Sequence, residues 1–555
     1  MQGSRFADID EIKSVAAEIN CADYECNAGG VPLMSDGKIM FVANQDAHSA
    51  IFGATGSKKS RNIIMPTIDS LIKSSESMVI VDPKGELYKR YGKKLKKHGY
   101  AVTVLNFRET GKGSRWNPLS TAYEYYKEGQ VDKSTECIRD IMDCLFSELA
   151  ENTHDAYWEK TSKDYGVGLA LLLREEACEE AFTLENIRLT HSQGDEKYAT
   201  TRYINEYYSM LDKYSDRAIH ISGTVNAPND TRASVHSVFS QPFGLYLQEN
   251  LRDMMCESDI ELSSIGLRKS VVFLITPDER SAYNPIIATF IKICYGVLID
   301  TAHNDDNDGV LPVRVNFILD EFCNLPAIPD FSNMISAARS RNIRFNLVIQ
   351  NLSQLYKNYS EAVAETIISN CEIWFVLRSN DYRLHERVKV RCGNYISEYS
   401  GISRPLVDTM NIQRLDKKRG EVLILMLGQY PFITELPDID EYFFKVYGVK
   451  DEPYQQRIPK ERTHFDFQEM VKNIKKMNLE KIMKNMELKA RDIKKKEEKS
   501  KEEEDAFPDD FESNFLTRRI VRKMEELDVI ERKLEDLKRT DKKTGEQDDT
   551  PAAIN

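Results

Sequence analysis

No pattern of cysteines and histidines in this sequence indicates a metal site or a disulfide framework. The ten cysteines are scattered, form no CxxC pair and have no histidine at the spacing of a zinc ligand. Most of them lie in apolar runs, as Cys294 does in "IKICYGVL", which favours buried, reduced thiols. Reduced thiols are typical of the cytosol, so we expect a cytoplasmic chain.

Targeting and membrane-spanning patterns are missing as well. The residues "MQGSRFADID" lack the charged-then-apolar order of a signal peptide. No apolar run approaches the roughly twenty residues that span a bilayer. We therefore expect a soluble chain without a transmembrane segment.

The chain has no excess of positive charge with which to bind a polyanion. Its 76 Lys and Arg stand against 89 Asp and Glu, for a formal net charge of −13. An acidic chain is not a general nucleic-acid binder, so a DNA contact requires a local basic surface. Strongly basic stretches interleaved with aromatic residues are not evident in the core, and a DNA-binding pore would have to form from loops assembled by oligomerisation.

Short apolar runs bounded by turn formers predict a parallel sheet. They are rich in β-branched residues and are separated by helical patterns, which is typical of an α/β fold with helices on both faces of the sheet. The predicted strands are 77–86, 269–279, 313–322, 343–351 and 371–381, and the clearest helices between them are 285–301 and 331–341.

Composition divides the 555 residues into several parts. Residues 121–264 have helical spacing without clear strand runs, and we expect an all-α domain inserted into the α/β domain. The expected parts are an N-terminal segment (1–45), the discontinuous α/β domain (46–120 and 265–455), the all-α insertion (121–264) and a charged helical or flexible tail (456–555). In the tail, Ile520, Met524, Leu527 and Leu534 suit one amphipathic helix.

The stretch "IFGATGSKKSRN" (51–62) is close to the phosphate-binding pattern GxxxxGK[ST]. It follows a short strand candidate, "HSAIF", and precedes a helical pattern in which Pro66 permits a kink, as a phosphate site at a helix N-terminus requires. The residues predicted to bind the nucleotide are Gly53, Ala54, Thr55, Gly56, Ser57, Lys58, Lys59, Ser60 and Arg61.

A second motif supplies acids for the same site. The apolar run "VNFIL" ends in Asp320 and Glu321. We expect Asp320 to hold Mg²⁺ together with Ser60, and Glu321 to orient and deprotonate the attacking water. Loop and acids together predict an ATP and Mg²⁺ site.

Other polar residues have two open interpretations each. Gln350 ends the next strand and could sense the γ-phosphate or be a polar strand end. Arg339, more than Arg341, could reach the γ-phosphate of a neighbouring copy, or either could complement a helix dipole. Lys84, in "DPKGE", could approach phosphate or nucleic acid or belong to a structural turn.

Several strings together resemble the TraG-type coupling proteins of type IV secretion and conjugation. They are "GSRFADIDEI", "IFGATGSKKS", "MVIVDPKGELY", "VTVLNF", "SRWNPLS", "VFLITPDERSAYNPI", "FILDEFCNLPAIPDF", "LVIQNLSQLYKNYSEAVAETIISNCEIWFVLRSND" and "GEVLILMLGQYPFI", in family order over roughly residues 3–440. The combination of the "LDEF" and "QNLSQL" strings is more specific than the loop.

This resemblance implies a RecA-like ATPase that works as a homo-hexamer at the inner face of the cell membrane. Such proteins pass single-stranded DNA bound to a relaxase, or secreted proteins, to the type IV secretion channel. By resemblance, Lys59 and Ser60 carry the phosphate and Mg²⁺ roles, and Asp320 and Glu321 the metal and water roles. Residues 121–264 look like the all-α domain associated with choosing the substrate.

Two features depart from the family. The membrane helices that usually precede the string at residue 3 are either lost or supplied by another subunit. Lys58 replaces a glycine of the loop, and a left-handed backbone there would cost roughly 1–2 kcal/mol. Its charge beside a triphosphate could offset some of this strain, so we expect nucleotide binding to survive and hydrolysis to be slow.

Two other functions stay open. One is a docking scaffold that binds nucleotide without productive turnover. The other is a double-stranded DNA translocase of the FtsK or HerA kind, although the helical insertion and "QNLSQL" argue against it. The basic half of the tail (456–500) could touch DNA or anionic lipid, and its acidic half could dock a basic partner such as a relaxase; solvated charged segments are the alternative for both.

Overall fold

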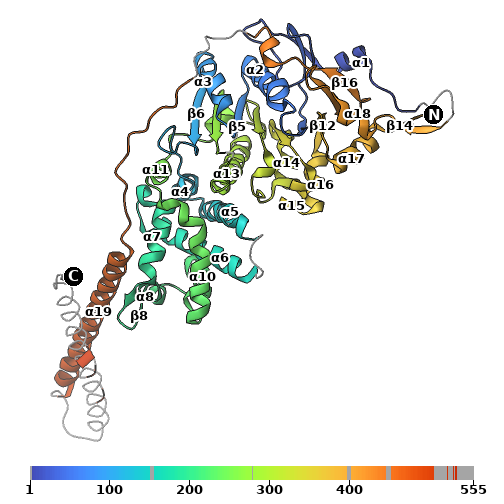
Figure 1. Ribbon diagram of the computed structural model, residues 1–555. Helices are drawn as coiled ribbons and strands as arrows, with labels where there is room; N and C mark the ends of the chain where they lie inside the picture. Colours follow the sequence, from blue (N-terminus) through green and yellow to red (C-terminus); the bar gives the residue numbers. More distant parts are fainter. Residues whose placement is uncertain are drawn as a thin grey trace, which may run out of the picture. The chain divides into compact units, whose positions relative to one another are not determined.

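The structure is a computed structural model that describes residues 3–150, 156–277, 279–304, 306–396, 402–444 and 452–504, with the single residues 522, 529, 532 and 533. The chain divides into two compact units, Met1–Leu189 with Asp216–His464, and Thr190–Ser215 with Phe465–Asn555 (Figure 1). The predicted heptad residues Ile520, Met524, Leu527 and Leu534 lie outside the described residues.

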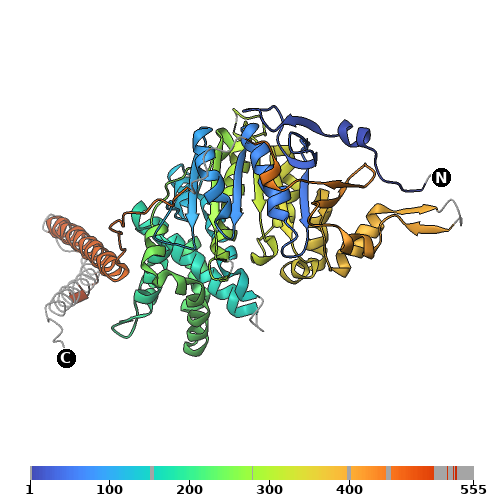
Figure 2. The same ribbon diagram turned by 45° about the horizontal axis from the view of Figure 1, so that its top comes forward.

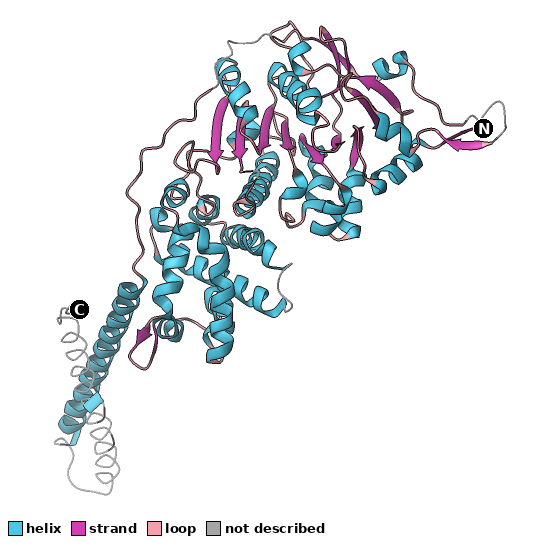
Figure 3. Cartoon of the chain, viewed as in Figure 1, coloured by secondary structure: helices cyan, strands magenta, loops and turns pink. Residues whose placement is uncertain are grey.

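A nine-stranded sheet lies at the centre of the first unit (Figure 3). Its order is β16-β15-β12-β4-β11-β10-β5-β9-β6; the strands from β12 to β6 are parallel, and β15 and β16 are antiparallel. The strands are β4 (His48–Phe52), β5 (Ser77–Asp82), β6 (Ala101–Asn106), β9 (Ser270–Ile275), β10 (Val315–Leu319), β11 (Ile343–Ile349), β12 (Cys371–Val376), β15 (Glu421–Met426) and β16 (Phe432–Glu435). The predicted α/β fold is confirmed, and each of the five predicted runs contains one of these strands.

Helices cover both faces of this sheet (Figure 1). On one face, Tyr88 of α3 packs edge-on against Phe273 of β9, with ring centroids 5.4 Å apart. On the other, Phe331 of α14 packs edge-on against Phe345 of β11 at 5.2 Å. The helices nearest the sheet are α2 (Met65–Lys73), α3 (Glu86–Lys97), α13 (Asn284–His303), α14 (Phe331–Ala338), α15 (Leu352–Asn358) and α16 (Glu361–Asn370). The helices predicted over 285–301 and 331–341 are both present, and the second finishes as a 3₁₀ turn, Arg339–Arg341.

Helix α13 qualifies the expectation that no apolar run approaches the length of a membrane span. By length and composition it could cross a bilayer, with a mean hydropathy of 1.5 in its most apolar window. However, most of its side chains are buried inside the protein, as Ile287, Phe290 and Leu298 are. A buried core helix explains this apolar run without a membrane.

The chain before β4 forms a small antiparallel sheet, ordered β1-β3-β2, that the sequence did not predict. Its elements are α1 (Ile9–Ser14), β1 (Ala17–Asn20), β2 (Val31–Ser35) and β3 (Ile39–Ala43). After β12, the chain forms α17 (Tyr382–Cys392), β13 (Asn394–Ile396), β14 (Ser403–Pro405) and α18 (Thr409–Arg414). Figure 2 shows the β13–β14 hairpin projecting beyond α17, and all six strand residues are exposed.

Helices fill the chain between β6 and β9, as predicted for residues 121–264. They are α4 (Ser120–Lys127), α5 (Val131–Ala150), α6 (Ala156–Glu176), α7 (Leu184–Asp195), α8 (Tyr203–Met210), α9 (Asp216–Val225), α10 (Asn229–Phe243), α11 (Glu249–Met254) and α12 (Ser264–Leu267). One correction concerns strands: a hairpin of two residues per strand, β7 (Lys197–Tyr198) and β8 (Thr201–Arg202), interrupts the helices. In the second unit, the long helix α19 spans Phe467–Glu504, and its Phe467 packs on Tyr207 of α8.

Part of the predicted tail is an ordered, extended segment of the first unit, residues 452–464. Arg457 is buried there; its Nε donates to Asp253 Oδ2 at 3.0 Å, and its Nη1 to the Lys112 carbonyl at 3.0 Å. Arg115 donates to the other oxygen of Asp253 at 2.9 Å. A carboxylate between two guanidinium groups therefore fixes this segment.

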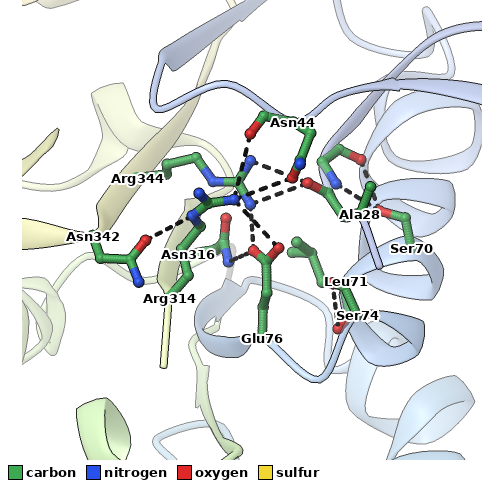
Figure 4. Close-up of polar contacts among 12 residues, drawn as sticks. Ala28, Asn44, Ser70, Leu71, Ser74, Glu76, Arg314, Asn316, Asn342 and Arg344 are labelled. Atoms are coloured by element: carbon green, nitrogen blue, oxygen red, sulfur yellow. Dashed lines mark hydrogen bonds and ion pairs between the residues drawn. The ribbon is translucent and has the colours of Figure 1, made fainter. Parts of the chain in front are cut away.

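A second buried charge cluster connects the small sheet to the large one (Figure 4). Glu76, just before β5, forms an ion pair with Arg344 of β11 and accepts a hydrogen bond from Asn316 of β10 at 2.9 Å. Arg344 also donates to the Gly29 carbonyl, ahead of β2, at 3.2 Å. Because buried charges are stable only when they are paired, this cluster fixes the small sheet at the amino ends of β10 and β11.

Candidate nucleotide site

The loop between β4 and the following helix lies at the carboxyl edge of the sheet. Gly53 N–H donates to the Ile349 carbonyl at the end of β11, and Ala54 N–H donates to the Arg378 carbonyl beyond β12. The helix after the loop starts with a π-helical segment, Ser60–Ile64, and continues as α2. Ligand sites in open parallel sheets form at this edge, and π segments are frequent at functional sites.

Two loop residues have a left-handed backbone. Gly56 has a φ of 72° and Lys58 a φ of 66°. A glycine adopts this conformation freely, whereas a lysine does so at a cost of roughly 1–2 kcal/mol. The phosphate-binding pattern has glycine at position 58, and the left-handed backbone there explains why glycine is preferred. In this chain the backbone is left-handed at this position even though the residue is lysine.

Lys59 is buried in the loop. Its Nζ donates to the carbonyl oxygens of Gly53 and Ala54, at 2.7 and 3.2 Å. Burial lowers the pKa of Lys59, while the charges of Asp320 and Glu321 oppose that shift. Lys59 therefore interacts electrostatically with both acids, and its predicted role at the phosphates stays a prediction.

The two acids follow β10, which is separated from β4 by the single strand β11. Burial, followed by the charge of Glu321, raises the pKa of Asp320 to about 6. Glu321 has a φ of 53°, a strained conformation for a non-glycine residue, and its N–H donates to Asp320 Oδ1 at 3.0 Å. Strained backbone of this kind is common at active sites.

Gln350 connects the loop to the acids. Thr55 Oγ1 donates to Gln350 Oε1 at 3.1 Å, and Gln350 Nε2 donates to Glu321 Oε1 at 3.0 Å. Asn324 donates to the other oxygen of Glu321 at 2.5 Å. A continuous polar chain therefore runs from the phosphate loop across the end of β11 to the acid proposed to activate water.

Asp82 is a third acid that sequence analysis missed. It ends β5, whose Val81 pairs in register with Leu319 of β10, so Asp82 and Asp320 end neighbouring strands. Burial raises the pKa of Asp82 to about 7, the charge of Asp320 adds to this shift, and the Tyr88 N–H, which donates to Asp82 Oδ2 at 3.0 Å, opposes it. The apolar run "SMVIV" directly before Asp82 was the available signal.

A cleft of about 240 Å³ lies beside these acids, over the ends of β5, β9 and β10. Its wall includes Asp320, Glu321, Arg280 and Asn284. Glu321, the acid predicted to activate water, therefore faces a cleft on the side away from β11.

Lys58 and Arg61 point to a partner that sequence analysis missed. Lys58 Nζ bonds to Asp438 Oδ2 at 3.1 Å, and Arg61 Nε contacts both oxygens of Asp438 at 2.9 Å. Arg61 also forms an ion pair with Asp440. The hydrogen bond from Arg61 and the weaker one from Lys58 hold the pKa of Asp438 well below its usual range. The charge of Lys58 is thus paired with Asp438 in this structure, and the expectation that it offsets strain beside a triphosphate stays a prediction.

The remaining predicted residues lie at different distances from the loop. Lys84 is exposed, and its charge helps to lower the pKa of Lys59, so it is near the loop. Arg339 forms an ion pair with Glu372 of β12 in the same chain. Arg341 Nη1 donates to the Ala337 carbonyl at 3.0 Å. Among the described residues, neither arginine bonds to the loop. This arrangement is compatible with both interpretations, an arginine that acts on a neighbouring copy and one that stabilises its own helix end.

The loop has the properties of a phosphate site. Within the described part of the chain, Ser57 Oγ is buried without a hydrogen-bond partner, and Lys59 bonds only to carbonyls of its own loop. No group of three or more His, Cys, Asp or Glu residues is placed to hold a metal ion within the described ranges. The predicted pair of one acid, Asp320, and one hydroxyl, Ser60, would suit Mg²⁺, which usually keeps several waters and shares phosphate oxygens.

Together, the strand order, the loop and the acids define a RecA-like P-loop fold with a largely helical region between two of its strands. Residues 8–421 match the family described as Type IV secretory system Conjugative DNA transfer. Because this match extends over well more than half of the chain, the chain belongs to that family.

Two curated relatives are similar to the chain at low identity. Protein VirD4 of Rhizobium radiobacter is 21% identical over 356 residues, which are 63% of this chain and 48% of that protein. Protein VirD4 of Rhizobium rhizogenes is 20% identical over 409 residues, which are 70% of this chain and 57% of that protein. The chain thus spans about half the length of these relatives.

Solved structures of a plasmid coupling protein share the fold. TrwB in complex with the ATP analogue ADPNP has a TM-score of 0.58 and 14% identity, over 83% of this chain and 96% of that one. TrwB in complex with ADP and Mg²⁺ has a TM-score of 0.56 at the same identity and the same coverage. At this identity the likeness establishes the fold alone.

Proposed function

We propose that this chain is the ATP-driven coupling protein of a type IV secretion or conjugative transfer system. The observation that supports this most is the polar chain Thr55–Gln350–Glu321, because it links the phosphate loop to the acid that would activate water. The bound nucleotides of the TrwB structures, ADPNP and ADP with Mg²⁺, support ATP and Mg²⁺ as the cofactors.

Each residue of the site has a defined task in this proposal. Lys59 would exchange its bonds to the Gly53 and Ala54 carbonyls for bonds to phosphate oxygens, and the amides of residues 56–61 would bind the same phosphates. Ser60 and Asp320 would hold Mg²⁺, which supplies positive charge against the phosphate oxygens. Glu321 would accept a proton from the attacking water, and Gln350 would orient that carboxylate.

The substrate, assembly and location follow from the family and are part of the same proposal. We infer that the chain delivers a relaxase bound to single-stranded DNA, or a secreted protein, to type IV channel components at the inner face of the membrane. It would act as a homo-hexamer in which Arg339 of one copy exchanges Glu372 for the γ-phosphate of its neighbour. Residues 121–264 would form the all-α domain that selects cargo, between the two parts of the nucleotide-binding domain, 46–120 and 265–455.

Turnover of ATP by the purified full chain, with and without single-stranded DNA, tests the proposal. The Glu321→Gln variant keeps the shape of the side chain but cannot accept the proton, so kcat should fall at least about 100-fold while nucleotide affinity changes little. A kcat that Glu321→Gln does not change would contradict ATP hydrolysis at this site. Stimulation by duplex DNA rather than single strands would favour a translocase of the FtsK or HerA kind.

A docking scaffold with little turnover is the second candidate. The left-handed Lys58, whose charge is paired with Asp438, favours it because the loop departs from the pattern of efficient ATPases. The same assay decides: binding of an ATP analogue without Glu321-dependent turnover would support the scaffold.

A further inference from the structure

The phosphate loop is fixed by a segment that lies far away in the sequence, residues 436–441. The Leu436 N–H donates to the Gly420 carbonyl at 2.9 Å, and the Leu436 carbonyl accepts from Asn62 Nδ2 at 2.8 Å. Asp438 follows and begins the 3₁₀ turn Ile439–Glu441. The backbone that carries Asp438 is therefore held against the start of the loop's own helix.

Arg61 holds the carboxylate of Asp438 independently of Lys58. Its Nε reaches both carboxylate oxygens at 2.9 Å, and the Asp438 side chain is only 15% exposed. A typical surface ion pair contributes little because two mobile side chains must be ordered. Here Arg61 already holds the acid, so the bond to Lys58 requires little further ordering of Asp438.

Lys58 is the one loop residue other than Gly56 with a left-handed backbone, within the described range 53–61. Lys58 Nζ ends on Asp438 Oδ2 at 3.1 Å. The amide groups that follow position 58 are those that open the helix and would contact phosphate. Any relaxation of Lys58 to a right-handed backbone would turn these amides away.

We propose that Asp438 is a positioning residue for the phosphate loop, and that its bond to the Lys58 side chain stabilises the left-handed backbone that glycine would otherwise provide. This inference rests on the proposed nucleotide site. Lys58 and Asp438 form one functional pair: the acid is needed because the lysine is present.

The affinity of the full chain for a fluorescent ATP analogue with Mg²⁺ tests the pair in a double-mutant cycle. Asp438→Asn should weaken binding about tenfold, which is ~1.4 kcal/mol, when residue 58 is lysine. With Lys58→Gly, the backbone no longer needs the carboxylate, and Asp438→Asn should weaken binding no more than about twofold. Restoration of affinity by the glycine is a result that general damage to the fold would not produce.

Asp440→Asn is the matched control. Asp440 lies in the same turn and pairs with Arg61 and Arg90. Because Asp440 does not bond to Lys58 among the described contacts, Asp440→Asn should change the affinity for the ATP analogue equally whether residue 58 is lysine or glycine. Equal losses for Asp438→Asn in both backgrounds, or no loss in either, would overturn the inference even if wild type binds. Absence of binding by wild type and by Lys58→Gly alike would instead overturn the proposed nucleotide site.

Discussion

At the scale of single residues, the site depends on groups whose conformations are costly by themselves. Lys58 and Glu321 both have left-handed backbones, and Asp82 and Asp320 are buried acids on neighbouring strands. Such features persist only where surrounding contacts enforce them. Gln350 and Asp438 provide those contacts, one from the adjacent strand and the other from the segment after β16.

Gln350 permits a test of positioning at this scale. Gln350→Ala removes both bonds of the Thr55–Gln350–Glu321 chain, so the Glu321 carboxylate keeps only its bond from Asn324 and is less firmly oriented, while the loop keeps its own backbone bonds. We expect kcat to fall about 10- to 100-fold with a change in KM below about threefold. Steady-state ATP turnover measures both constants.

The adjacent Asn351→Ala is the control for Gln350→Ala. Asn351 caps α15 through its bond to the Ser353 N–H and does not contact Glu321 within the described residues. A loss in kcat as large as that of Gln350→Ala would show that helix stability, and not the orientation of Glu321, explains the effect.

At the scale of elements, His48 connects the strand that carries the loop to the neighbouring strand β11 and to helix α14. His48 is buried at the start of β4; its Nδ1 accepts from the Phe345 N–H at 2.9 Å, and its Nε2 bonds to the Ile335 carbonyl at 2.8 Å. Burial lowers the pKa of His48 to about 4. The ring is therefore neutral in the folded protein at neutral pH.

The pH dependence of stability follows from this shift. Between pH 6.5 and 4 the unfolded chain binds a proton at His48 that the folded protein does not, so the contribution of His48 to the free energy of unfolding should decrease as pH falls through this window, by up to about 3 kcal/mol. Denaturant unfolding of wild type and His48→Gln isolates this contribution: the stability of wild type relative to the variant should decrease as pH falls from 6.5 to 4. The exposed His303→Gln should keep the wild-type slope; if His48→Gln also keeps it, His48 is not responsible.

Sequence patterns predicted the elements that are long and buried on both faces, because these produce uninterrupted apolar runs. In the large and the small sheet they missed β1 to β3, β6, β15 and β16. Of these, β1 to β3 and β16 are short and β6 lies at a sheet edge, whereas β15 is a buried apolar run that the sequence patterns did not assign. The loop and Asp320–Glu321 were predictable because each motif is local. Asp438 was not, since only the fold brings it to Lys58 and Arg61, and Asp82 was concealed in a turn-like string.

At the scale of the whole molecule, the proposed ring leads to a prediction about concentration. Arg339 is 40% exposed and is held by Glu372, so a neighbouring copy could compete for it. If the active site requires a neighbour's arginine, ATP turnover per chain should rise steeply with protein concentration, and Arg339→Ala should abolish that rise. Turnover measured across a dilution series provides the check; a rate per chain that dilution does not change would count against a shared site.

The buried Asp253, held by Arg115 and Arg457, has a practical consequence for anyone who shortens the protein. Residue 457 lies well after β16, the last strand of the sheet, in a charged region that could be mistaken for a dispensable tail. A fragment that ends before residue 457 would retain every strand of the sheet and both nucleotide motifs. It would, however, leave the buried Asp253 paired with Arg115 alone. Expression boundaries are therefore better placed after His464.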